Sequence, residues 1–354
     1  MKELIAQEYK RIARYVEVFI VIVLAAFLYN TYFPTLPHKT FYLSGKNSKS
    51  TAEELEKYGC SVTFIDQIFM HMGKVPKKGW YHVVKEKQSR FSFFSSLYRQ
   101  KAKPMKVVVY AGETSDELCK RLANDMKLDK ANLLEEYNRR SKFKEADIFA
   151  QRYILARSAD EFSVMQYLFD RSDTMLSAFI KEYFSKEPAQ STLKMLLTIA
   201  SIIQKESNSV KEMPLISSVI YNRLEKKMKL QMDCTLNYGC YSHVIVTPER
   251  IKSDLTYFNT YKYKGLPPYP LGTVTIEALE AAMMPQKSNY LFFMLTPSGE
   301  HNFSVTYKEH LENIKRFRAY QKKRKALKEA ENNATVSTTD TNKTKVQRVP
   351  SSTI

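Results

Sequence analysis

The sequence contains little glycine, only nine residues in 354. None is spaced as G-x-G-x-x-G or G-x-x-x-x-G-K, so the glycine-built dinucleotide and P-loop motifs are absent. Cysteine is equally scarce, with four residues and no C-x-x-C pair, which excludes a disulfide scaffold. The six histidines form no H-E-x-x-H motif. These absences leave a chain without the common sequence signs of a bound nucleotide, a zinc protease site or a redox pair.

The chain is long enough for two or three domains, and its 44% hydrophobic content excludes general disorder. It carries 55 Lys and Arg against 37 Asp and Glu, a formal charge of +18. Two runs, 74–106 and 315–330, contribute +9 and +7 of that excess. Such a local excess is usually a solvated face, but nucleic acid, an anionic membrane surface or an anionic polymer are the partners it can indicate. The first run is also rich in aromatic residues, which indicates a basic, partly stranded insertion.

The amino terminus predicts a membrane anchor. Three cations precede a stretch, 18–37, that has no charged residue, and Val18 to Leu28 is continuously apolar. With its aromatic flanks, the segment 15–33 spans 19 residues, close to the roughly 20 that a bilayer helix needs. The basic flank, 1–14, is expected to stay in the cytoplasm, with the rest of the chain beyond the inner membrane. This location argues against nucleic acid as the partner.

A cleaved signal peptide is the alternative interpretation of the same segment. Ala25-Ala26 lacks a convincing small-x-small cleavage site, so an uncleaved single-pass anchor is favoured.

Residues 38–145 predict a small α+β domain that contains the basic insertion 74–106. Lys106 to Gly112 reads as a strand, Glu113 to Leu128 as a helix with Ser115 as N-cap, and a second helix begins at Asp129. This order resembles a LysM-like glycan-binding module in pattern. Residues 162–184 read as a helical linker or as part of the next domain.

Residues 146–320 predict a second, mixed α+β domain. Two helices are expected, from Ser191 and from Pro214, and then a strand at Asn289 to Pro297. After residue 330 the chain is rich in Asn, Thr, Ser and Lys, so 331–354 is expected to be a disordered tail. The predicted fold class is therefore α+β behind one transmembrane helix.

Glu206 is the residue whose surroundings suggest chemistry. It lies on the same helical face as Ile199, Ile202 and Ile203, so a carboxyl follows an apolar stripe. Desolvation raises the pKa of such a group, and a carboxyl that stays protonated can act as a general acid in glycosidic cleavage. From this face alone, a Glu paired with Lys205 or Lys211 at a helix end is the more common explanation.

The residues around Glu206 resemble the endolytic murein transglycosylase family, also called YceG-like. The resemblance rests on ordered motifs over about 120 residues: Ala200 to Glu206, Pro214 to Ile216, Val219-Ile220, Asn222 to Leu224, Met228, Leu230-Gln231, Asp233, Thr235, Tyr238-Gly239, Asn259 to Tyr261, Gly265 to Pro268, Pro270, and His301, Phe303, Ser304, Thr306, Glu309 and His310.

The resemblance implies a membrane-anchored enzyme that cleaves the β-1,4 bond between N-acetylmuramic acid and N-acetylglucosamine in peptidoglycan strands. Glu206 would be the catalytic acid and then the base that forms a 1,6-anhydro ring. Gln231, Asp233, Asn259 and Tyr261 would bind substrate, although Asp and Asn also commonly stabilise their own loops. Asn222 and Arg223 are expected mainly to tie two elements together. No cofactor and no metal is implied, and peptidoglycan synthases are the suggested protein partners.

The chain also departs from the family pattern. Cys234 stands where the family commonly has Pro, Phe258 where it has Tyr, and the segments 148–153 and 269–275 differ from the usual motifs. Cys234 and Cys240 would suit a disulfide outside the cytoplasm; a zinc site with His243 has the wrong spacing. Cys60 and Cys119 are expected to be buried.

Two other functions remain open at this point. The same cleft could belong to a peptidoglycan hydrolase, a muramidase that uses water. A membrane-anchored scaffold that binds the cell wall without catalysis is the non-enzymatic alternative.

Overall fold

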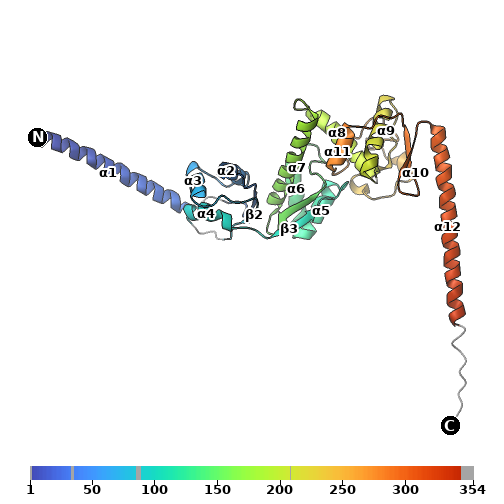
Figure 1. Ribbon diagram of the computed structural model, residues 1–354, viewed down its shortest axis with the longest axis horizontal. Helices are drawn as coiled ribbons and strands as arrows, with labels where there is room; N and C mark the ends of the chain where they lie inside the picture. Colours follow the sequence, from blue (N-terminus) through green and yellow to red (C-terminus); the bar gives the residue numbers. More distant parts are fainter. Residues whose placement is uncertain (1, 33–35, 85–88, 208, 344–354) are drawn as a thin grey trace, which may run out of the picture. The chain divides into compact units, whose positions relative to one another are not determined.

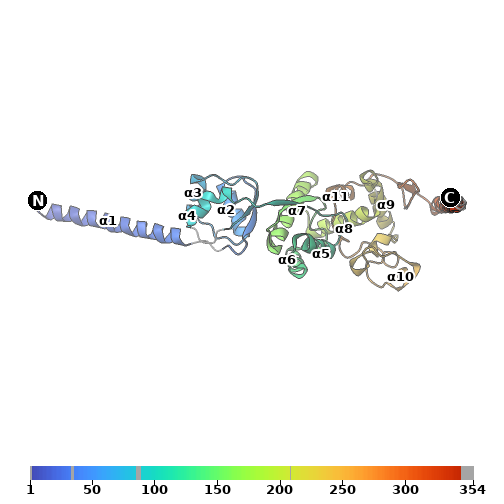
Figure 2. The same ribbon diagram turned by 90° about the horizontal axis from the view of Figure 1, so that it is seen from below.

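The computed structural model describes residues 2–32, 36–84, 89–207 and 209–343, and it divides into two compact units, Met1–Glu187 and Pro188–Ile354. Helices dominate both units in Figures 1 and 2, and the described strands form three antiparallel pairs, β1–β2, β3–β4 and β5–β6. The α+β class predicted from the sequence is confirmed.

Helix α1 (Lys2–Thr31) contains most of the apolar segment 15–33 that was predicted as an anchor. Its part from Gln7 to Thr31 is 25 residues long and apolar enough to cross a membrane. At 1.5 Å per residue this part measures about 37 Å, longer than the roughly 30 Å hydrocarbon core. The large apolar side chains from Val16 to Leu28 are exposed, unlike those of a core helix. Residue 33, the predicted end of the segment, lies outside the described residues.

The first unit continues with β1 (Thr40–Leu43), α2 (Ser48–Lys57), α3 (Phe64–Met72), β2 (Gly79–His82), α4 (Arg90–Ser96) and the 3₁₀ turn η1 (Leu97–Arg99). β1 and β2 pair antiparallel, with Phe41 opposite Tyr81. Both side chains are buried with Phe93 and Phe94 of α4 in one core. The described parts of the basic run, 74–84 and 89–106, are thus folded into the unit, because Tyr81, Phe93 and Phe94 belong to this core.

The structure divides the chain into two compact units at residue 187, whereas the sequence predicted a domain boundary at residue 145. Strand β3 (Pro104–Val108) pairs antiparallel with β4 (Arg152–Ala156), with α5 (Ser115–Met126) and α6 (Lys130–Arg140) between them. Helix α7 (Glu161–Tyr183) follows, and its Leu168 shares a buried core with Val107, Leu118 and Leu155. Burial of these apolar side chains in one core joins 146–187 to the first unit.

The N-cap of α5 also differs from the prediction by one residue. The Thr114 side chain accepts a hydrogen bond from the Glu117 backbone N–H, and Glu117 Oε2 accepts one from Thr114 N at 2.8 Å. This is a capping box. Ser115 instead donates its N–H and hydroxyl to Glu145, at 2.8 and 2.9 Å. The helix start is therefore tied to the loop after α6.

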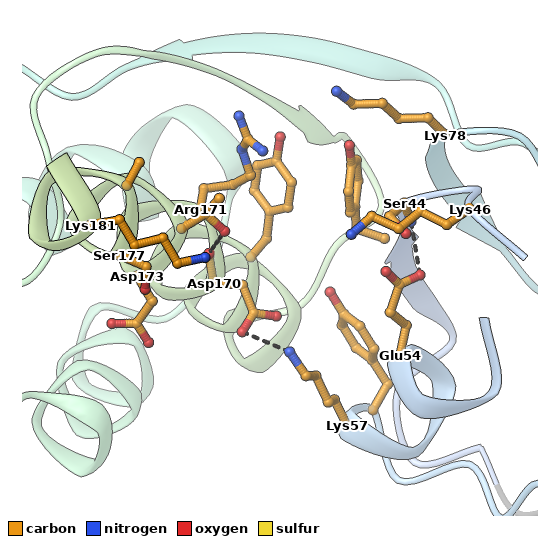
Figure 3. Close-up of a pocket in the computed structure, with 15 residues that line it drawn as sticks. Ser44, Lys46, Glu54, Lys57, Lys78, Asp170, Arg171, Asp173, Ser177 and Lys181 are labelled. Atoms are coloured by element: carbon orange, nitrogen blue, oxygen red, sulfur yellow. Dashed lines mark hydrogen bonds and ion pairs between the residues drawn. The ribbon is translucent and has the colours of Figure 1, made fainter. Parts of the chain in front are cut away.

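A cavity of about 820 Å³ lies between the β1–α2 segment and α7 (Figure 3). Charges of both signs line it. Lys57 Nζ lies 3.1 Å from Asp170 Oδ1 and links α2 to α7, while Glu54 Oε2 accepts a hydrogen bond from Ser44 N at 2.8 Å. The cavity is thus a largely charge-compensated contact region within the first unit.

In the second unit, α8 (Gln190–Glu206), α9 (Met213–Glu225) and α11 (Ile276–Met283) carry most of the buried apolar residues. Short turns η2 (Val210–Glu212), η3 (Asp233–Thr235) and η4 (Gly239–Tyr241) and helix α10 (Pro248–Ser253) lie in the connections. The hairpin of β5 (Phe292–Leu295) and β6 (His301–Ser304) then leads into α12. The predicted order of helices and strand is confirmed.

Helix α12 spans Tyr307–Lys343. Residues 331–343, which were predicted to be disordered, are therefore helical in the structure. The Lys-, Glu- and Ala-rich stretch before residue 331 favours helix, and a nucleated helix extends residue by residue at little cost. Residues 344–354 of the predicted tail lie outside the described residues.

Candidate active site

Glu206 is the last residue of α8, at the end of the apolar stripe that the sequence predicted. Ile199, Ile202 and Ile203 are each 0% exposed. The helix ends because the Ser207 N–H closes the last turn onto Ile203 O at 2.9 Å, and the chain then becomes extended. The carboxyl therefore projects from a rigid, buried element, which is the arrangement that fixes a catalytic group best.

Glu206 lines a cavity of about 580 Å³ in the second unit. Three of the four predicted substrate-binding residues, Gln231, Asp233 and Tyr261, line the same cavity. Its other lining residues are Arg223, Leu230, Met232, Phe292, Phe293, Met294, Leu295, His301, Tyr307 and His310. The β5–β6 hairpin and the start of α12 supply most of these, and no residue spacing predicts that they face Glu206.

Asn259 does not line this cavity. It is 0% exposed, and its Nδ2 donates to Ile251 O and Asp254 O at 2.8 and 2.9 Å. Its Oδ1 accepts a hydrogen bond from Tyr261 N at 3.1 Å. The polar groups of Asn259 are therefore used to fix the loop that carries Tyr261, and the prediction of direct substrate contact does not fit its position.

Two loops meet beside Glu206 through Thr260. Gln231 N donates to Thr260 O at 3.2 Å, and Met232 N donates to Thr260 Oγ1 at 3.1 Å. Gln231 has a φ of 50°, the left-handed region, which turns the chain between Leu230 and Met232. Tyr261 donates its hydroxyl to Asp233 Oδ1 at 2.6 Å. These bonds hold the polar lining of the cavity in place before any ligand binds.

The pKa of Glu206 is raised, chiefly because burial disfavours the charged carboxylate, and the nearby charge of Asp233 adds to the effect. Hydrogen bonds with Cys234 and the electrostatic influence of His301 act in the opposite direction. The Cys234 backbone N–H donates to Glu206 Oε1 at 3.3 Å. A proline here, as the family pattern has, would lack this N–H. The carboxyl thus favours the protonated form yet has a donor ready for its charged form.

Two hydrogen bonds between His301 and Glu212 shape the cavity wall. His301 donates its backbone N–H to Glu212 Oε1 at 2.6 Å, and its Nδ1 lies 3.0 Å from Glu212 Oε2. Burial alone would raise the pKa of Glu212, but these hydrogen bonds outweigh it and lower that pKa. The pair fixes the His301 ring, of which 6% is exposed, at the edge of the cavity.

Arg223 holds the loop and the hairpin together, as predicted. Its Nε donates to Leu291 O at 2.6 Å and its Nη1 donates to Leu230 O. The guanidinium also lies 5.1 Å from the Phe292 ring centre, and the His310 ring stacks on Phe292 at 5.2 Å. Burial lowers the pKa of Arg223. Asn222 has the same role, because its Nδ2 donates to Ser288 O and Tyr290 O.

All four cysteines are free thiols. Cys60 and Cys119 are buried, as expected, while Cys234 is buried and Cys240 exposed, so the disulfide suggested between the last two is not formed. Within the described residues, no group of three or more His, Cys, Asp or Glu side chains could hold a metal ion.

A family profile described as the YceG-like family matches residues 43–316, more than three quarters of the chain. The chain belongs to the YceG-like family. Every residue that lines the Glu206 cavity falls within the matched segment, so the cavity is part of the family region of this YceG-like chain.

Three known proteins are similar to this YceG-like chain. An endolytic murein transglycosylase from Bacillus subtilis (strain 168) is 37% identical over 159 residues, covering 41% of this chain and 43% of that protein. One from Streptococcus pneumoniae serotype 2 is 28% identical over 176 residues, covering 48% and 31%. A crystal structure of a putative YceG-like protein from Listeria monocytogenes is 23% identical and covers 78% of this chain and 99% of that one, with a TM-score of 0.49. The first two matches span less than half of either relative's length.

Proposed function

We propose that this protein is a lytic transglycosylase that cleaves peptidoglycan glycan strands internally. One observation carries the proposal: a half-buried Glu with a raised pKa ends a rigid helix inside a cavity with polar and aromatic walls. A single protonated carboxyl is the group that glycosidic cleavage without water requires. The two curated relatives named as endolytic murein transglycosylases support the same reaction class.

In the proposed reaction, Glu206 protonates the oxygen that leaves from the β-1,4 bond between N-acetylmuramic acid and N-acetylglucosamine. The resulting carboxylate accepts the hydrogen bond from Cys234 N. It then takes the proton from the 6-hydroxyl of the muramic residue, whose oxygen attacks the anomeric carbon and closes a 1,6-anhydro ring. The carboxyl ends in its starting protonated form, so no second acid and no water are consumed.

The remaining lining residues would bind the sugar rings. Gln231 and the Tyr261–Asp233 pair offer amide, hydroxyl and carboxylate groups to N-acetyl and hydroxyl groups. Tyr307 offers a flat, exposed aromatic surface against which a pyranose ring can pack. Asn259 would act indirectly, by fixing the loop of Tyr261.

The other parts of the chain suit an enzyme held near the cell wall. We place α1 across the inner membrane, with 1–14 in the cytoplasm and both folded parts outside, because the basic flank precedes the apolar segment. The β3–α5–α6–β4 order supports a LysM-like glycan-binding role for that part of the first unit. Peptidoglycan synthases are the partners that the family resemblance suggests. An ordered Glu206 site argues against a purely non-enzymatic scaffold.

A muramidase is the second candidate, because Asp233 places another carboxylate in the same cavity. Its Oδ1 already accepts the Tyr261 hydroxyl, which leaves it less available as a nucleophile or base. Mass spectrometry of purified peptidoglycan digested by the full chain distinguishes the two reactions. We expect 1,6-anhydro-muramic ends; reducing muramic ends would show that water is the acceptor and that the transglycosylase assignment is wrong.

The pH profile gives an independent check on the role of Glu206. Its raised pKa means that the active, protonated form persists above the pH range in which an ordinary carboxyl ionises. Activity should therefore fall with a single limb as pH rises through the raised pKa. Initial rates of anhydro-product formation between pH 4 and 9 would measure this limb. A rate that increases throughout this range would contradict protonated Glu206 as the acid.

A further inference from the structure

A second cavity of the first unit, about 870 Å³ in volume, is lined by cations without any carboxylate among the described residues. Arg99, Lys101 and Lys103 come from the basic run 74–106, and Arg157 comes from the residue after β4. The hydroxyl groups of Ser92 and Ser96 on α4 also line it. The proposed glycan chemistry at Glu206 uses none of these residues.

Backbone pairing brings these cations together. The segment after η1 pairs with β2, since His82 N donates to Gln100 O at 2.8 Å and Ala102 N donates to Trp80 O at 2.9 Å. On its other side, Arg157 N donates to Lys103 O at 3.0 Å, which extends the β3–β4 pairing. Residues far apart in the sequence therefore present their charges in one place, on backbone that is already ordered.

The charges of this cavity are not compensated by any carboxylate of the described residues. Within the part of the chain that the structure describes, Arg99, Lys101, Lys103 and Arg157 form no ion pair. The cavity of Figure 3 differs, because there Lys57 pairs with Asp170 and Glu54 is present. Arg99 Nε donates to the Tyr98 hydroxyl at 2.7 Å, which fixes one edge of the guanidinium, and its other donors have no hydrogen-bond partner among the described residues. Four close cations repel one another, and a bound anion with several acceptor oxygens, such as a phosphate, would stabilise them.

The position of α4 indicates where the anion comes from. The residue before Ser92, Phe91, donates its backbone N–H to Asn30 Oδ1 at 2.9 Å, and the Arg90 guanidinium lies 4.8 Å from the Tyr29 ring centre. Asn30 and Tyr29 belong to the last turn of the apolar helix α1. Helix α4 is seven residues long, about 10 Å, and the headgroup layer extends roughly 5–8 Å beyond the hydrocarbon core. The cavity is thus within reach of headgroup phosphates if α1 spans the membrane.

We propose that this cavity binds the phosphate group of an anionic membrane lipid. The proposal rests on the membrane anchor of the proposed function but not on its catalytic reaction. Each Lys or Arg near an anionic bilayer contributes a modest electrostatic attraction to the lipid headgroups. Because this cavity places four such side chains together, they can bind one lipid phosphate at a defined site. The proposal thus assigns a ligand, a lipid phosphate, to the basic run 74–106, which has no role in the proposed active site.

The test uses the full chain in a neutral detergent and native mass spectrometry to measure binding of dihexanoylphosphatidylglycerol. The variant Arg99→Ala/Arg157→Ala removes two lining charges, and Lys49→Ala/Lys120→Ala removes two exposed charges elsewhere in the same unit. We expect the first variant to lose about 25-fold in affinity, about fivefold for each charge, and the control variant to stay within twofold of the wild type. Phosphatidylcholine of the same chain length should bind more weakly.

Three results would overturn the proposal. Equal losses in the two variants would show that binding follows net charge only. Inorganic phosphate that displaces the lipid at equal concentration would identify a site for free phosphate. Unchanged binding in the Arg99→Ala/Arg157→Ala variant would exclude this cavity. Alkaline extraction of membranes tests separately whether α1 anchors the protein. The Glu206→Gln variant should bind lipid like the wild type. Failure of the anchor or of the catalytic proposal can therefore be distinguished from failure of the lipid site.

Discussion

Replacing Glu206 by Gln should lower the rate of glycan-strand cleavage by about 10³-fold, within the 10²–10⁴-fold range typical of general acid–base catalysis. Gln has nearly the same shape as protonated Glu, so it can still accept the hydrogen bond from Cys234 N. It cannot release a proton to the leaving oxygen or take one from the 6-hydroxyl. The rate of soluble product release from purified peptidoglycan measures the effect, and binding of strands to the variant should be retained.

The stability of the same variant separates a catalytic loss from misfolding. Because the folded state raises the pKa of Glu206, the carboxyl contributes its full stability below its unfolded pKa and loses it as pH rises through the folded pKa. Near neutral pH the uncharged Gln should therefore leave the unfolding temperature unchanged or raise it. Glu225, an exposed Glu at the end of α9, provides the matched control, and Glu225→Gln should keep activity within twofold. Undiminished product release by Glu206→Gln would remove Glu206 from the mechanism.

The sequence predicted those features that depend on neighbouring residues. The apolar segment within α1 and the face of α8 that carries Glu206 both follow from spacing along one helix, and both are confirmed. Pairing between strands that are far apart in the sequence cannot be predicted from such local patterns. The β3–β4 ladder joins residues about 50 positions apart. It is one reason why the two units divide at residue 187 and not at the predicted residue 145.

The candidate site shows the same limit. Gln231, Asp233 and Tyr261 were identified from motifs and do line the cavity, but residue type alone could not tell that Asn259 points into its own loop. Phe292 and Tyr307 are apolar or aromatic residues like many others in this chain. Only the return of the β5–β6 hairpin and α12 to the end of α8 makes them part of the cavity.

Replacing Arg90 by Met should destabilise the first unit by about 3–5 kcal/mol, because it would leave a buried carboxylate without its partner. Arg90 and Asp66 side chains are 2% and 0% exposed, and two hydrogen bonds of 2.6 Å join them. Arg90 also donates to Ser61 O at 2.8 Å. Thermal unfolding of the full chain in detergent should show a fall of about 6–20 °C in the transition of this unit.

The second substitution needed to interpret this result is Asp66→Asn. Asp66 also accepts the Thr63 N–H at 2.8 Å at the start of α3, and Asn keeps an oxygen for that bond without a charge. The double variant Arg90→Met/Asp66→Asn should therefore recover at least about 1 kcal/mol relative to Arg90→Met alone, since no unpaired charge stays buried. Lys106→Met, at an exposed position of β3, should change stability by less than about 0.5 kcal/mol. If the single and double variants were equally unstable, lost packing around Tyr29 and Phe94 would explain the effect instead of the buried charge.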